Sequence, residues 1–160
     1  FVAPVSRFEI MVGKTLGGAT VAVIQGILVF LITLLVGFRP ESLALLPLAL
    51  LFLIMIAVVF SAIGVAIAAR LDDMQSFPLI INFLIQPLFY LSGAIFPLLD
   101  LPRALDLVTK INPLSYGVDG LRYALGAPHV FAPTTSFLVL AIIGLTTLLI
   151  GRYQFSKIEL

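Results

Sequence analysis

Few residues of this chain could do chemistry, and one set of them is uncharged. Asn82, Gln86 and Tyr90 follow one another at intervals of four residues, so on a helix they share one face. In a membrane segment such side chains can line a transport pathway. Amides can equally join neighbouring helices, with bonds worth about 1 kcal/mol or less. Spacing alone leaves both interpretations open.

A second set of polar residues includes one acid and one base. Asp119 and Arg122 are three residues apart, a spacing that brings two side chains together on a helix surface. The simplest interpretation is an ion pair that lets a partly buried segment carry charge. A gate at the mouth of a pathway is the functional alternative, and spacing alone favours the pair.

The sequence argues against a nucleotide site, a metal site or a catalytic centre. Gly13-Lys14-Thr15 resembles the end of a phosphate-binding loop, but Phe8 holds the place of its first glycine. A long apolar stretch also follows, where that motif requires a strand and helix unit. His129 is a lone histidine and there is no cysteine, which excludes thiolate catalysis and metal sites rich in cysteine or histidine.

Composition indicates a protein embedded in a membrane. Hydrophobic residues make up 61% of the chain, charged residues 11%, and the mean hydropathy is +1.22. A soluble domain is typically about half apolar and about a quarter charged. The net charge is +1 and no basic stripe exists, so a nucleic-acid partner is not expected.

Long uncharged stretches separated by charged residues predict the elements that carry these side chains. Each exceeds the ~20 residues that a helix needs to cross about 30 Å of hydrocarbon. They contain no Asp, Glu, Lys or Arg, which argues against a proton relay, a voltage sensor or an ion-coupled transporter. Residues 48–54 show none of the alternation of a barrel strand. We therefore expect an all-α membrane protein with transmembrane helices at 15–38, 42–69, 74–97 and 130–151.

The connection at residues 100–128 differs from the short polar turns elsewhere. Pro102, Pro113 and Pro128 divide it into two short amphipathic segments. These are too polar to cross the membrane and too apolar to lie free in water. We expect them to lie in the interface or to re-enter the membrane.

Other features predict how the long helices bend, pack and face. Pro78 and Pro87 interrupt the third stretch and predict kinks. Gly18, Ala22 and Gly26 recur every four residues, which predicts close helix packing. With four spans both ends share a side, which carries five Lys or Arg in short flanks against four on the other. That excess favours cytoplasmic ends.

Three stretches in order resemble the permease subunits of ABC type-2 exporters. They are Ala3-Pro4-Val5-Ser6-Arg7-Phe8-Glu9-Ile10-Met11-Val12-Gly13-Lys14, then Leu91-Ser92-Gly93-Ala94-Ile95-Phe96-Pro97-Leu98, then Ile111-Asn112-Pro113-Leu114-Ser115-Tyr116-Gly117-Val118-Asp119-Gly120-Leu121-Arg122. The last two flank the connection at 100–128 and are the more specific. A complete subunit of that family has six spans, so the four here would be the later ones. The absence of an initiator Met at Phe1 fits this expectation of a fragment.

The resemblance implies roles for several segments. Residues 1–14 would be a cytoplasmic coupling helix that docks on an ATPase, residues 100–128 a re-entrant helix pair and 152–160 a cytoplasmic tail. The coupling candidates are Arg7, Phe8, Glu9 and Lys14. The candidates for the re-entrant gate are Asn112, Pro113, Tyr116, Asp119 and Arg122.

The implied function is export through the plasma membrane, driven by a separate ATPase. The chain would supply the pathway and hold no cofactor, while ATP and Mg²⁺ would be bound by the cytoplasmic ATPase partner. A second permease copy and membrane lipid are the other expected partners. The family's cargo includes drugs, lipids and polysaccharides, and the sequence does not choose among them. A membrane scaffold or assembly subunit is the alternative, while an intramembrane enzyme is disfavoured because the spans hold no catalytic cluster.

Overall fold

The computed structural model describes residues 6–71, 76–96, 98 and 101–156, and within these ranges all regular structure is helical. Parts of several predicted segments lie outside the described residues. These are 1–5 of the coupling segment, 72–73 of the turn after the second span, 74–75 and 97 of the third span, 99–100 at the start of the predicted re-entrant segment, and 157–160 of the tail. The expected all-α architecture is confirmed for the described part of the chain.

Helix α1, Arg7–Leu35, is continuous through the boundary expected at Lys14. It begins with a capping box in which Ser6 accepts a hydrogen bond from the Glu9 main chain, and the Glu9 carboxylate accepts one from Ser6 N–H at 2.7 Å. It ends at Leu35, earlier than the predicted Phe38, because Gly37 has φ +105° and reverses the chain. The coupling segment and the first span are therefore one rod within the described residues.

Two further long helices accompany α1. A 3₁₀ turn, η1 (Leu43–Leu45), leads into α2 (Leu46–Ala68), and α7 covers Pro133–Ser156. Among the described residues, α1, η1 with α2, and α7 are the three helices long and apolar enough to cross a membrane. Helix α7 continues past the predicted end of its span at residue 151, so residues 152–156 of the expected tail are helical.

Within the described residues, the helix found in the segment expected at 74–97 is shorter than a full span. Helix α3 (Ser76–Ile80), the π-helical turn η2 (Ile81–Ile85) and α4 (Gln86–Tyr90) follow one another without a break, and turns occupy 91–96. Fifteen residues at about 1.5 Å each reach about 22 Å, less than the ~30 Å of a hydrocarbon core. The fourth full-length span is thus not confirmed, and a shorter apolar helix takes its place.

Of the two prolines in this shorter helix, the structure tests only the kink expected at Pro87. Pro78 is the third residue of α3, directly after residues that the structure does not describe, so the kink expected there stays a prediction. Pro87 lies in the interior, and its ring excludes the usual α-helical bond to the carbonyl four residues earlier. The wide turn η2 directly precedes it, closed by a bond from Gln86 N–H to Ile81 O. The irregularity expected at Pro87 is therefore a π-helical turn.

Two short helices follow Pro102, and Pro113 begins the second of them. Helix α5 covers Arg103–Ile111 and α6 covers Pro113–Ala124. Asn112 caps α6 by accepting a hydrogen bond from Leu114 N–H at 3.0 Å. Gly126, with φ +80°, ends α6 in the same way as Gly37 ends α1.

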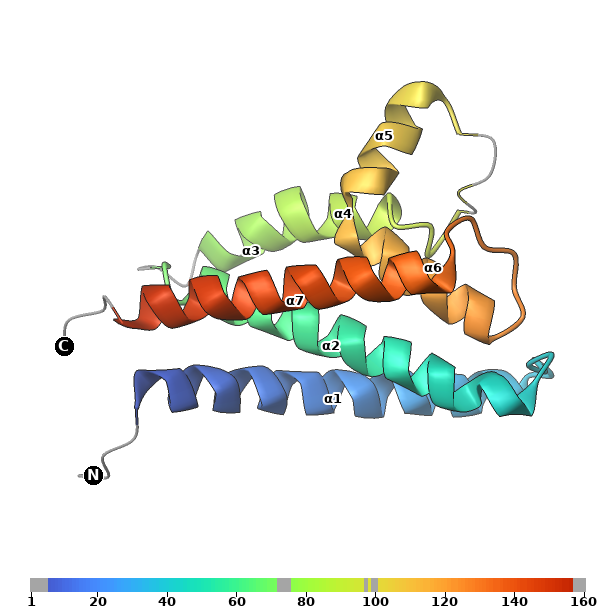
Figure 1. The fold of residues 1–160 in the computed structure, drawn as a ribbon, viewed down its shortest axis with the longest axis horizontal. Helices are drawn as coiled ribbons and strands as arrows, with labels where there is room; N and C mark the ends of the chain where they lie inside the picture. Colours follow the sequence, from blue (N-terminus) through green and yellow to red (C-terminus); the bar gives the residue numbers. More distant parts are fainter. Residues whose placement is uncertain (1–5, 72–75, 97, 99–100, 157–160) are drawn as a thin grey trace.

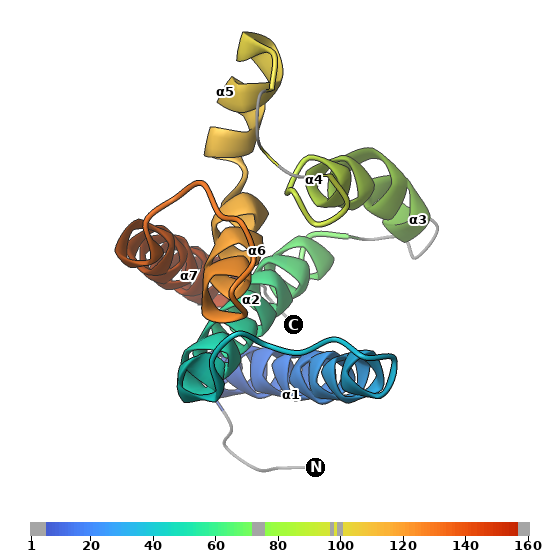
Figure 2. The same cartoon turned by 90° about the vertical axis from the view of Figure 1, so that its right-hand side faces the viewer.

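Helix α2 lies at the centre of the bundle, with α1, α6 and α7 around it (Figures 1 and 2). Small residues allow this close packing. A Cβ added at Gly18 would lie 3.0 Å from Ser61 Oγ, and one at Gly26 would lie 2.7 Å from Leu53. Gly120 of α6 faces the ring of Phe52, which is 1% exposed. The small residues predicted on α1 therefore do pack against α2.

The bundle has two ends that are joined differently. At one end, α1 begins beside the last turns of α7 (Figure 1), and Gly151 lies directly against Met11. At the other end, the α1–α2 connection meets the loop after α6, where Glu41 packs against Gly126. Helix α5 projects sideways from the bundle, whereas α6 lies within it (Figure 2).

Candidate functional site

Helix α6 is fastened to the end of α4 by three side chains along one stripe. Each donates a hydrogen bond to a main-chain oxygen in the last turn of α4 or in the turns that follow it. The pairs are Asn112 Nδ2 with Leu88 O (2.6 Å), Ser115 Oγ with Leu91 O (3.3 Å) and Arg122 Nη2 with Gly93 O. We call these three residues together with Asp119 the α6 anchor.

Asp119 fastens α6 to a different segment, the residues just before α7. Its side chain is 2% exposed, and its Oδ1 accepts a hydrogen bond from Val130 N–H at 2.9 Å. Its Oδ2 accepts from Phe131 N–H at 2.7 Å and from Val130 N–H at 3.1 Å. A carboxylate buried without a cation is costly unless donors surround it, and here main-chain N–H groups supply them.

The ion pair expected between Asp119 and Arg122 is not formed. Although both residues are described, each charged group has a different main-chain partner, on a different neighbouring segment. The helical spacing places them on one stripe as predicted, but buried carbonyl and N–H groups compete for both side chains. An exposed pair, Lys110 with Asp106 at 2.8 Å, occurs instead on α5.

The remaining gate candidates position the turn between α5 and α6. Pro113 occupies the first position of α6, where its missing N–H is not needed. Tyr116 donates from its hydroxyl to Lys110 O at 2.8 Å, and its ring stacks on Phe131 with 4.5 Å between centroids. The structure thus brings all five gate candidates onto α6 and its cap, with Tyr116 and Asp119 both contacting Phe131.

The coupling candidates lie at the start of α1 beside the end of α7. A Cβ added at Gly151 would lie 2.5 Å from Met11 Sδ, and Met11 is 2% exposed. The Arg152 guanidinium lies 5.7 Å from the centre of the Phe8 ring, a cation–π contact. We call these four residues the α1–α7 junction. Arg7 begins α1, Lys14 is exposed, and the Glu9 carboxylate is already used in the capping box.

The three pathway candidates lie on the shorter helix and are exposed. Asn82 belongs to η2, while Gln86 and Tyr90 begin and end α4. Within the part of the chain that the structure describes, the two amides have no hydrogen-bond partner. The described structure therefore shows neither that these amides join helices within this chain nor that they line a pathway.

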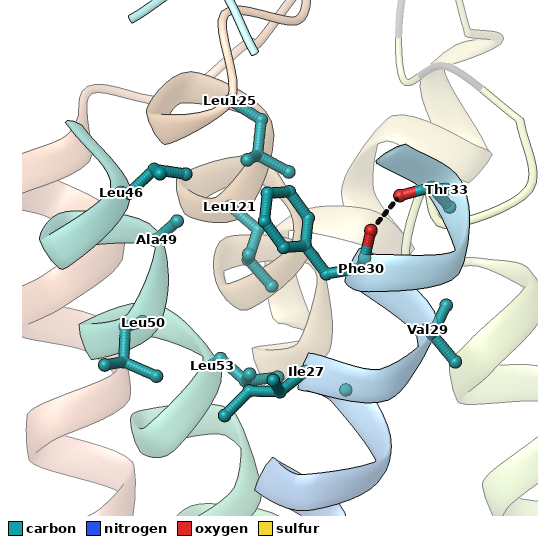
Figure 3. A pocket seen from close by; sticks show the side chains of 11 residues that line it. Ile27, Val29, Phe30, Thr33, Leu46, Ala49, Leu50, Leu53, Leu121 and Leu125 are labelled. Carbon is teal, nitrogen blue, oxygen red and sulfur yellow. Dashed lines mark hydrogen bonds between the residues drawn. The ribbon is translucent and has the colours of Figure 1, made fainter. Parts of the chain in front are cut away.

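An apolar cavity of about 460 Å³ opens between α1, α2 and α6 (Figure 3). Leucines of α2 and of the last turn of α6, with Ile27, Val29 and Phe30 of α1, form most of its wall. Its hydroxyl group, on Thr33, donates to Phe30 O at 2.7 Å, so its proton is not free to bind a ligand. The cavity can accommodate hydrocarbon, but its lining provides no charged group. Among the described residues, no group of three or more His, Cys, Asp or Glu could hold a metal ion.

Comparison with known proteins decides the family. The sequence model of the family described as ABC-2 type transporter matches residues 1–125. That range includes α1, α2, the shorter helix, α5 and α6. The chain belongs to the ABC-2 type transporter family. It is a membrane permease chain of that family, as the resemblance of its three motifs implied.

Individual relatives of this ABC-2 chain carry the names of transport and nodulation proteins. The inner membrane transport permease YadH of Escherichia coli K12 is 32% identical over 145 residues, which cover 88% of this chain and 54% of YadH. Nodulation protein J of Rhizobium meliloti is 30% identical over 123 residues, 76% of this chain and 46% of the relative. The putative transport permease ycf38 of Porphyra purpurea is 26% identical over 122 residues, 74% and 41%. The chain thus spans about half the length of these curated relatives, and no solved structure matches it.

Sequence reasoning overlooked some residues of the ABC-2 chain that the structure places in these sites. Ser115 joins the α6 anchor, and its place three residues after Asn112 was a usable signal. The α1–α7 junction gave no such signal, because about 140 residues of sequence separate Met11 from Gly151 and Arg152. Only the packing of α1 against α7 reveals them.

Proposed function

We propose that this chain is part of the permease subunit of an ATP-driven exporter in the inner (plasma) membrane. The family match over residues 1–125 carries this proposal. Three apolar helices of spanning length support it, since they provide a membrane domain. In this proposal a separate cytoplasmic ATPase binds ATP and Mg²⁺, and a second permease copy completes the membrane part. The cargo is a drug, a lipid or a polysaccharide-type molecule that moves outward.

The proposal assigns roles to the two ends of the fold. The start of α1, with Arg7, Phe8, Glu9 and Lys14, contacts the ATPase on the cytoplasmic side. The re-entrant pair, with Asn112, Pro113, Tyr116, Asp119 and Arg122, then lies at the outer side and gates the pathway. Packing supports this division, because the α1–α7 junction and the loop after α6 lie at opposite ends of the bundle.

The pathway in this proposal is lined partly by the shorter helix. Asn82, Gln86 and Tyr90 are exposed there, and the two amides are available to contact a cargo. The alternative function is a scaffold without cargo. It requires the same packed helices, but it does not explain why these polar side chains are exposed.

Reconstitution of the full-length permease with its ATPase tests the proposal. We expect the purified pair to hydrolyse ATP, and Lys14→Glu to weaken co-purification of the ATPase, because it reverses an exposed charge at the contact. Arg39→Glu is the matched control, since Arg39 is exposed in the α1–α2 connection at the other end. A complex that assembles and never responds to any candidate cargo would favour the scaffold. Equal effects of both substitutions would remove the coupling assignment.

A further inference from the structure

Helix α7 is fastened at both of its ends, and to different parts of the fold. Its last turns pack against the start of α1, while the residues just before it are bound by α6. From its first residue, Pro133, to Gly151, α7 rises roughly 27 Å at about 1.5 Å per residue. A helix of this length transmits displacement along its axis, because compressing it would break its internal hydrogen bonds.

The attachment at the α1–α7 junction is close and apolar. Gly151 leaves no space between the α7 backbone and Met11, whose side chain is almost fully buried. From the same turn of α7, the Arg152 guanidinium lies 5.7 Å from the centre of the Phe8 ring, which remains partly exposed. Gly151 and Arg152 are adjacent on α7. They contact Met11 and Phe8, which are three residues apart on α1. A movement of the first turns of α1 therefore displaces the end of α7.

The attachment at the other end is polar and directional. Apolar helix contacts allow small sliding movements. The Asp119 carboxylate instead binds the N–H groups of two consecutive residues, Val130 and Phe131, which fixes the register of α6 against the start of α7. Stacking of Tyr116 on Phe131 reinforces the same contact. Helix α6 in turn holds the end of α4 through Asn112, Ser115 and Arg122.

We infer that Asp119 is a positioning residue, through which α7 carries movement of the α1–α7 junction to the re-entrant pair and the end of α4. The inference rests on the proposed function, because it takes the ATPase as the source of that movement. Asp119 touches no cargo in this account. It holds α6 at a fixed position relative to α7, so that α5 and α6 move with α7 when the cytoplasmic ATPase closes.

Hydrogen exchange on the assembled transporter tests this inference. The full-length permease with its ATPase is placed in lipid nanodiscs and measured without nucleotide and with ATP plus vanadate. In the unaltered complex we expect trapping to change deuterium uptake at residues 7–14 and also at residues 103–124. With Asp119→Ala, the change at 7–14 persists and the change at 103–124 falls by at least about twofold.

A second variant separates coupling from folding. In a cysteine-free background, Asp119→Cys with Val130→Cys replaces the hydrogen bonds by a disulfide that can be made and broken in one preparation. We expect oxidation to restore the response at 103–124 and reduction to abolish it again. Asp106→Ala is the matched control, since this acid also lies in the re-entrant pair but forms an exposed ion pair with Lys110. It should leave the response unchanged.

The outcomes distinguish this inference from the function on which it rests. A full response at 103–124 in Asp119→Ala, or in the reduced cysteine pair, overturns the role of Asp119 and leaves the exporter proposal intact. A complex that neither hydrolyses ATP nor responds at 7–14 overturns both. A response at 7–14 without one at 103–124 in the unaltered complex also overturns the link.

Discussion

Helix α6 and the shorter helix of residues 76–90 are two polar-bearing regions of a mostly apolar chain. On α6, Asn112, Ser115 and Asp119 are buried, and each is hydrogen-bonded to main-chain groups of neighbouring segments. On the shorter helix, Asn82 and Gln86 are exposed, and among the described residues nothing pairs with their amides. The first set is explained by the fold itself. Nothing in the part of the chain that the structure describes explains the second set.

This difference has a physical basis in the cost of unpaired polar groups. Burying a polar group without a partner costs roughly 1–3 kcal/mol in proteins, and hydrocarbon offers no partner at all. The α6 anchor avoids the cost by using helix-end carbonyls and loop N–H groups. Amides on the lipid-facing or partner-facing side of a helix avoid it only if cargo, a second copy or water reaches them.

Removal of the buried carboxylate should give the largest loss of stability. We expect Asp119→Ala to lower the free energy of unfolding by about 2–4 kcal/mol, because hydrogen bonds to charged groups contribute roughly 1.5–3 kcal/mol each and two N–H groups lose their acceptor. Unfolding in detergent micelles measures this. Asp106→Ala, at an exposed ion pair, should change little. Equal effects would contradict the distinction between buried and exposed polar groups.

Filling the contact between α6 and α2 should have the next largest effect. A Cβ at Gly120 would lie 2.4 Å from the Phe52 ring, so Gly120→Ala should destabilise by about 1–3 kcal/mol. Gly64→Ala is the control, because nothing lies within 4 Å of its Cβ position and alanine favours a helix. The same unfolding measurement applies. If the Gly120 variant were as stable as the Gly64 variant, α6 would not be held tightly against α2.

The sequence predicted the elements of this fold better than their ends and contacts. Apolar length located α1, α2 and α7, and proline and amphipathic spacing located α5 and α6, because these signals are local. Gly37 ends α1 by a left-handed turn that hydropathy does not register. The partners of Asp119 and Arg122 were missed because they lie on segments that only the tertiary fold brings near. Asn112, Asp119 and Arg122 of the α6 anchor were predicted from the sequence, but Asp119 and Arg122 were wrongly expected to form an ion pair with each other.

Removal of the α6 cap should have a moderate effect. Asn112→Ala should cost about 1–2 kcal/mol, since it removes an N-cap bond to Leu114 N–H and leaves Leu88 O without its side-chain donor. Ser42→Ala is the matched control, because Ser42 occupies the N-cap of η1 without a side-chain bond. Hydrogen exchange at residues 86–96 should rise in the Asn112 variant alone. A rise in both variants would mean that the cap does not specifically hold the end of α4.

The smallest change in stability is expected at Gln86, whose amide has no hydrogen-bond partner among the described residues. Gln86→Leu in the purified permease should shift the free energy of unfolding by less than about 0.5 kcal/mol, as exposed positions usually do. In the assembled transporter the same substitution should alter the ATP hydrolysis rate, because the amide then meets cargo or a second copy. A loss of stability equal to that of Asn112→Ala would mean that Gln86, like the residues of the α6 anchor, stabilises the fold. The shorter helix would then be a packed structural element, and its exposed amides would no longer point to a pathway.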